Sequence, residues 1–211
     1  MFPEKRKYNL TKYKIPKDRI FITTDYMRKR YGRFDPNVFK RWEAKGEVEK
    51  VRNGLYRSID PPIVSDMDRF IIANSIQEPS YVSLYSALYY YNLIPEYVFN
   101  VTSVTTKKTN SFVFRDANFS YQHLKKPLFF GYRIQNWKGE QYRIASLEKA
   151  LLDFAYLEPS FGDADWLEEM RFDEDVLRDE VDWVQAYIYG YQMKSEATMI
   201  RMAKLLEVYD L

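Results

Sequence analysis

The chain has 211 residues, of which 46% are hydrophobic and 29% charged, a balance typical of a globular protein with a substantial core. It contains no Cys and a single His, which excludes disulfide bonds, thiolate sites and any site that requires two imidazoles. The sequence has no run of eighteen apolar residues and no apolar leader, so we expect a protein of the cytoplasm that does not enter the membrane.

Charge is distributed unevenly along the chain. Residues 1–60 hold 17 Lys and Arg against 8 Asp and Glu, a net charge of +9, whereas residues 61–211 hold 15 against 22, a net charge of −7. This asymmetry indicates two functions on one chain, the first facing a polyanion. The Pro-rich stretch "IDPPIV" at residues 59–64 interrupts regular structure. We therefore expect two domains, residues 1–60 and 61–211.

Two short helices are predicted in the basic domain. Thr24 can cap a helix that has Asp25 in its first turn, runs through Tyr31 and stops at Gly32, and Asp35-Pro36 can start a second helix that ends before Gly46. Two helices joined by a short turn that contains Gly are typical of a helix-turn-helix.

A β-hairpin is predicted directly after the second helix, in "VRNGLYR" at residues 51–57. Asn53-Gly54 favours a two-residue type I′ turn, because both residues accept a positive φ. Period-two alternation would place Val48, Lys50 and Arg52 on one face. The order helix, turn, helix and hairpin predicts a winged helix-turn-helix, with the hairpin as the wing.

The second helix has two faces at helical spacing. Val38, Phe39 and Trp42 would pack inward, while amide and cationic side chains would face outward to read base edges in the major groove. The alternative for this polar face is an ordinary solvated surface. The arginines of the wing would contact phosphates. The residues predicted to contact DNA are Arg28, Lys29, Arg30, Arg33, Asn37, Lys40, Arg41, Arg52, Asn53 and Arg57.

The second domain is expected to be of the α+β class. Helices are predicted over residues 65–76 and 84–91, the latter capped by Ser83 and stopped by Asn92, and a long helix is predicted to start after the cap Ser146. Between them, alternating segments predict a mostly antiparallel sheet with strands at residues 97–105, 111–115, 119–124, 128–135 and 141–144. Amphipathic helices would complete the C-terminus.

An acidic segment opens the C-terminal region. Residues 153–182 hold twelve carboxylates against two cations, Arg171 and Arg178. Such a segment is ordinarily a solvated face, and the alternative is a surface that repels DNA and either binds a basic protein or repels a second copy of the chain.

An enzymatic function finds little support in the residues. Glu148 lies in the first turn of the predicted helix, where a carboxylate complements the helix dipole. Lys149 and Asp153 are spaced i, i+4 and would form an ordinary exposed ion pair. The paired Glu168 and Glu169 are the other acidic candidates. The sequence has no phosphate-binding loop, nucleophile elbow or metal-ligand cluster, so no catalysis, cofactor or metal is expected, and His123 receives no role. A regulator that senses a small ligand through its second domain stays open.

Three stretches together resemble the AbiEi-type antitoxins, transcriptional regulators of type IV abortive-infection toxin–antitoxin systems. They are "RNGLYR", "YVSLYSALYYYNLIPE" and "RIASLEKALLDFAY", and the resemblance covers about residues 20 to 157. Asn92 stands where that family commonly has Gly, and both accept a left-handed conformation.

The resemblance implies a repressor of its own operon that binds operator repeats in duplex DNA. It also implies an antitoxin, residing in the second domain, that neutralises a nucleotidyltransferase-like toxin, by direct contact or functionally. The alternative is an orphan winged-helix regulator whose second domain dimerises or senses a small ligand.

Overall fold

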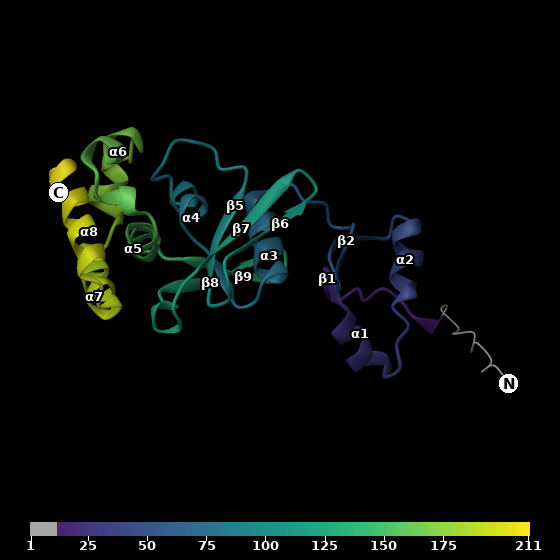
Figure 1. Cartoon of the computed structure of the whole chain (residues 1–211). Coiled ribbons are helices and arrows are strands. Elements are labelled where there is room, and N and C mark those ends of the chain that lie inside the picture. The colour runs from purple at the N-terminus through teal and green to yellow at the C-terminus, as the bar shows by residue number, and fades with distance from the viewer. Residues whose placement is uncertain (1–11) are drawn as a thin grey trace. The chain divides into compact units, whose positions relative to one another are not determined.

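The computed structural model describes residues 12–211, and the fold is of the mixed α+β class (Figure 1). The chain divides into two compact units, Met1–Val64 and Ser65–Leu211, each with a sheet of its own. The division lies four residues after the boundary expected at residue 60. Across the described residues, no helix has both the length and the apolar character that crossing a membrane requires.

The first unit contains a three-stranded antiparallel sheet and two short helices. The elements follow in the order β1 (Phe21–Thr23), α1 (Thr24–Tyr31), α2 (Asn37–Ala44), β2 (Val48–Arg52) and β3 (Leu55–Ser58), and the strand order is β1-β3-β2. The helix at residues 24–31 is as predicted, but its cap is Thr23 rather than Thr24. The Thr23 hydroxyl accepts the Tyr26 N–H at 3.0 Å.

Helix α2 is fixed by aromatic packing. Val38, Phe39 and Trp42 are buried, as their spacing predicts, and the Phe39 ring stacks on Tyr56 of β3 with ring centroids 3.9 Å apart. The Asp35 carboxylate accepts the Asn37 N–H at 3.0 Å, which satisfies one of the free donors at the start of the helix. This packing determines which face of α2 remains exposed.

The hairpin forms where it was predicted, but its details differ. Gly54 has a φ of +78°, whereas Asn53 lies outside the positive-φ region, so the turn is not type I′. A β-bulge between Lys50 and Arg52 shifts the register of β2 against β3. The predicted alternation is therefore wrong, because the bulge turns both Val48 and Val51, three residues apart, into the core.

The second unit is built on a six-stranded sheet with the order β6-β7-β5-β4-β9-β8. Its strands are β4 (Ser80–Val82), β5 (Val101–Thr105), β6 (Asn110–Phe114), β7 (Ala117–His123), β8 (Tyr132–Trp137) and β9 (Glu140–Ala145). The pairs β4–β5, β6–β7 and β8–β9 are antiparallel, and the pairs β4–β9 and β5–β7 are parallel. The sheet is thus more mixed than expected, since two of its pairs are parallel. The central strand β4, which was not predicted, joins β5 to β9.

Two helices frame this sheet. Helix α3 (Asp66–Ile76) starts at a capping box in which Ser65 and Asp68 bond each other's backbone N–H, and it packs against β4, β5 and β9. Helix α4 (Tyr85–Tyr90) is shorter than predicted and follows Leu84, which has a φ of +57°. Ser83 does not cap it, and Asn92, with a φ of +58°, stands in the left-handed conformation expected of the stop.

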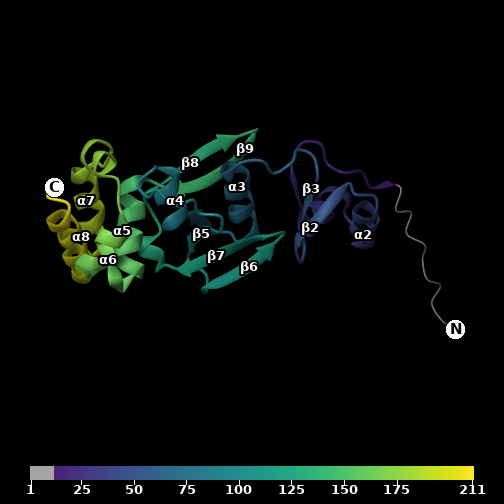
Figure 2. The same cartoon turned by 90° about the horizontal axis from the view of Figure 1, so that it is seen from above.

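The C-terminal helices gather around α5 (Leu147–Leu157), whose cap is Ser146 as predicted. They comprise the short 3₁₀ segment Pro159–Gly162, α6 (Ala164–Glu169), the π-helical turn Val176–Glu180, α7 (Trp183–Met193) and α8 (Glu196–Val208). A further 3₁₀ turn, Lys126–Leu128, precedes β8. In both views α5 lies between the sheet and the pair α7 and α8 (Figures 1 and 2).

Candidate nucleic-acid interface

The exposed face of α2 carries the side chains predicted to read bases. Asn37 and Lys40 are exposed and Arg41 is partly exposed, on the side opposite the buried Val38, Phe39 and Trp42. The Asn37 amide donates to Asp35 at 2.9 Å. Since bidentate recognition of adenine needs both the donor and the acceptor of the amide, Asn37 must leave Asp35 before it reads a base. Lys40, fully on the exposed side of the helix, is the best placed of the three.

Helix α1 and the loop after it add a second group of cations. Arg28, Lys29, Arg30 and Arg33 are all exposed. Arg28 pairs with Asp25 at 3.0 Å, and Arg30 donates to the Tyr26 hydroxyl at 2.6 Å, a bond that raises the pKa of Arg30. Exposed interactions of this kind contribute little free energy, so Arg28 and Arg30 could give them up to bind a phosphate group instead.

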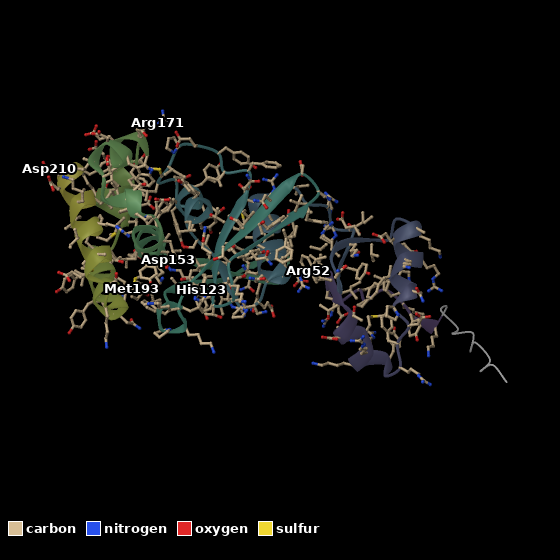
Figure 3. The ribbon with its side chains drawn as sticks, in the orientation of Figure 1. Arg52, His123, Asp153, Arg171, Met193 and Asp210 are labelled. Atoms are coloured by element: carbon tan, nitrogen blue, oxygen red, sulfur yellow. The ribbon has the colours of Figure 1, made fainter. Side chains whose placement is uncertain are left out.

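The hairpin tip is held against the start of α1. The Thr24 N–H donates to the Gly54 carbonyl at 3.0 Å, and Asn53 is exposed beside it. Arg52, labelled in Figure 3, is partly exposed and donates to the Asn53 carbonyl at 3.1 Å. Lys50, which was not among the predicted contacts, is exposed on the same strand and adds to the positive charge.

Arg57 does not belong to this exposed set. Its side chain is 3% exposed and pairs with Glu49 across the hairpin at 2.6 Å, and it also donates to the Pro61 carbonyl. A guanidinium held this way cannot reach a phosphate without breaking a buried ion pair. Arg57 is therefore poorly placed for the predicted DNA contact, and its side chain instead ties β3 to β2 and to the segment that follows.

The ionisable residues of α5 that were considered for catalysis are buried rather than exposed. Lys149 and Asp153 form an ion pair, but both side chains are fully buried, so the prediction of an exposed pair is wrong. Asp153 (Figure 3) also accepts hydrogen bonds from the Tyr81 hydroxyl at 2.9 Å and the Ser83 hydroxyl at 2.8 Å. These contacts tie α5 to β4 and to the residue that follows it.

A signal for this burial was present in the sequence. Residues 147–155 are apolar on every side except at Glu148, Lys149 and Asp153, and a helix that is apolar all round is buried. Among the residues that the structure describes, no group of three or more His, Asp or Glu side chains is placed to hold a metal ion.

A cavity of about 330 Å³ lies between α3 and the β8–β9 hairpin. Its polar lining includes Asn74, whose amide accepts the Arg143 N–H at 2.6 Å and donates to the Arg143 carbonyl at 3.5 Å. The Asn74 amide thus pairs with the backbone N–H and carbonyl of Arg143 as a neighbouring strand would. These hydrogen bonds stabilise β9, so we assign the amide a structural role.

In comparisons with known proteins, no protein-family model matches the chain and no curated protein matches it. The functional assignment therefore depends on the residues and geometry described above.

Proposed function

We propose that the chain is a DNA-binding transcriptional regulator of the winged helix-turn-helix type, in which α2 is the recognition helix and the β2–β3 hairpin is the wing. The observation that carries the proposal is the exposed cationic face of α2, backed by a buried aromatic core. The order α1, α2, β2 and β3 and the net charge of +9 over residues 1–60 support it.

Contacts to phosphates and to bases have different consequences in this proposal. Lys29, Arg33 and Arg52 would bind phosphates and fix the orientation of the domain. Lys40 and Arg41 would enter the major groove, where Arg and Lys bind guanine. These three phosphate contacts would give a slope of about −3 in a plot of log K against log salt concentration.

A binding titration with DNA from the protein's own upstream region, repeated at several salt concentrations, tests this proposal. Fluorescence anisotropy of labelled duplex should show the steep slope. A flat salt response, or no binding at low salt, would contradict DNA binding.

Following the resemblance to AbiEi-type antitoxins, we further propose that the second unit neutralises a nucleotidyltransferase-like toxin encoded beside it. A fragment that starts near Pro61 should rescue cells from the toxin while losing repression, because Ser65 starts the capped helix α3 of a unit with its own sheet. If the fragment unfolds cooperatively yet gives no rescue, while the full chain rescues, this division of functions is wrong.

The acidic segment can be tested for direct toxin contact in the full chain. Asp175 and Asp179 are exposed, and reversal of both to Lys changes charge with little effect on packing. Asp173 should be left intact, because its carboxylate accepts the Val176 N–H at 3.0 Å and starts the following helical turn. Loss of both rescue and co-purification with the toxin would support direct contact. Intact rescue would show that these carboxylates take no part in toxin contact.

A further inference from the structure

Helix α7 presents four large apolar side chains to solvent. Val184, Tyr187, Ile188 and Tyr191 are 72%, 65%, 51% and 75% exposed. Their spacing of i, i+3, i+4 and i+7 aligns them along one face of the helix, which we call the α7 stripe. A continuous exposed apolar face of this kind marks a contact surface.

The inner face of α7 explains why these side chains point outward. The buried residues are Ala186, Gly190 and Met193, and α8 approaches so closely that a Cβ atom on Gly190 would lie 2.4 Å from the Met199 sulfur. At Gly190 a side chain would fit only if Met199 moved. Helix α7 is thus apolar on both faces, and the residues on its outer face are not covered by the rest of the unit.

A groove runs beside the α7 stripe. It has a volume of about 200 Å³ between α5, α7 and α8, and Tyr187 belongs both to its wall and to the stripe. The groove is lined by Leu152, Trp183, Ala186, Tyr187, Met199, Met202, Ala203 and Leu206.

A ridge adjacent to a groove is the arrangement that a two-fold symmetric interface uses. In such an interface the same patch is contributed by both copies, so that the ridge of each can fill the groove of the other. Residues 183–193 contain no charged side chain, so pairing two copies of α7 brings no like charges together along the stripe.

The ends of α7 favour an antiparallel arrangement of the two copies. Asp182, the N-cap, and Lys194, the C-cap, are both exposed at opposite ends of the helix. In an antiparallel pair, Asp182 of each copy would lie near the opposite charge of Lys194 in the other, and the helix dipoles would also oppose.

The exposed area reaches the lower limit for a specific contact. The two tyrosines of the stripe offer roughly 150 Å² each and Val184 and Ile188 roughly 100 Å² each, or about 1,000 Å² over two copies. We propose that the α7 stripe and its groove bind a second copy of this chain, forming an antiparallel homodimer through the second unit. This proposal is independent of DNA binding.

Sedimentation velocity of the full chain between about 1 and about 100 µM tests the proposal. The wild type should dimerise, and Ile188→Glu should weaken dimerisation by about 100-fold, because a carboxylate would be buried at the centre of the contact. The matched control is Ile134→Glu, since Ile134 is 56% exposed on β8, outside the stripe. It should dimerise like the wild type.

Cross-linking supplies a second measurement that does not introduce charge. Because the chain has no Cys, Ile188→Cys provides a single thiol near the two-fold axis, and a short bis-maleimide should link two copies. Ile134→Cys should give no link. Three results would overturn the proposal: a wild type that is monomeric at all concentrations, equal weakening of dimerisation by both Glu substitutions, or equal cross-linking of both Cys variants. A monomeric wild type would assign the α7 stripe to a different partner.

Discussion

Replacing Asp153 by Ala should destabilise the second unit severely. The substitution leaves the Lys149 ammonium, fully buried, without its counter-ion, and it leaves the hydroxyls of Tyr81 and Ser83 without their acceptor. Burial, together with Asp153, holds the pKa of Tyr81 well above its usual range, so the Tyr81 hydroxyl remains a donor at every pH where the protein is handled.

The size of the effect follows from these contacts. Breaking a buried ion pair by removing one partner costs about 3–5 kcal/mol, and each buried hydroxyl left unpaired adds about 1–3 kcal/mol. The single substitution should therefore lower the free energy of unfolding by at least about 5 kcal/mol, which is a large part of the about 5–15 kcal/mol that stabilises a typical domain.

A double variant separates the charge from the hydrogen bonds. Lys149→Met combined with Asp153→Asn removes both charges but keeps an amide oxygen that can accept from Tyr81 and Ser83. Because the pair itself contributes little net stability, the double variant should lose less than Asp153→Ala.

Urea unfolding, followed by far-UV circular dichroism and tryptophan fluorescence, measures these differences. Three of the four Trp residues, Trp137, Trp166 and Trp183, lie in the second unit and report on it. A loss below about 1 kcal/mol for Asp153→Ala, or a larger loss for the double variant, would refute the reasoning.

Other predictions concern the first unit and the pH dependence of stability. Arg57→Ala should lower the melting temperature as well as DNA affinity, because it breaks a buried pair, whereas Arg52→Ala should weaken binding to all sequences equally at an unchanged melting temperature. Arg41→Ala should relax sequence preference in a competition assay, at a cost of about 1–3 kcal/mol for one base contact, and an equal loss on all sequences would reassign it to a phosphate. Burial raises the pKa of Tyr91 to about 12, above the usual value of about 10, so its contribution to stability is full below pH 10 and is lost as pH rises toward 12. Tyr91→Phe should flatten that alkaline decline in urea unfolding, and an unchanged decline would contradict it.

Local signals allowed much of the fold to be predicted from the sequence. The buried positions of α2 follow helical spacing, and the predicted cap Ser146 stands directly before an apolar helical segment. The α2 face could be predicted for the same reason, because the residues that anchor it and those it exposes are neighbours in sequence.

Features that depend on distant contacts could not be predicted in this way. Strand β4 has three residues, too few for a periodic pattern, and it is a strand because β5 and β9 lie on either side of it. The spacing of Lys149 and Asp153 is the same in an exposed pair and a buried one. Arg57 was predicted to contact DNA because the local sequence shows neither the bulge in β2 nor the contact with the Pro61 carbonyl. Both of these depend on tertiary structure.

The measurement that tests the central claim most directly compares two charge reversals in the full chain. Lys40→Glu with Arg41→Glu changes the exposed face of α2, and Lys125→Glu with Lys126→Glu makes the same change in net charge on exposed residues of the second unit. Anisotropy titrations with upstream DNA should show a loss of about 100-fold or more for the α2 variant and less than about threefold for the control. Equal losses for the two variants, or unchanged binding by the α2 variant, would contradict the assignment of α2 as the DNA-binding helix.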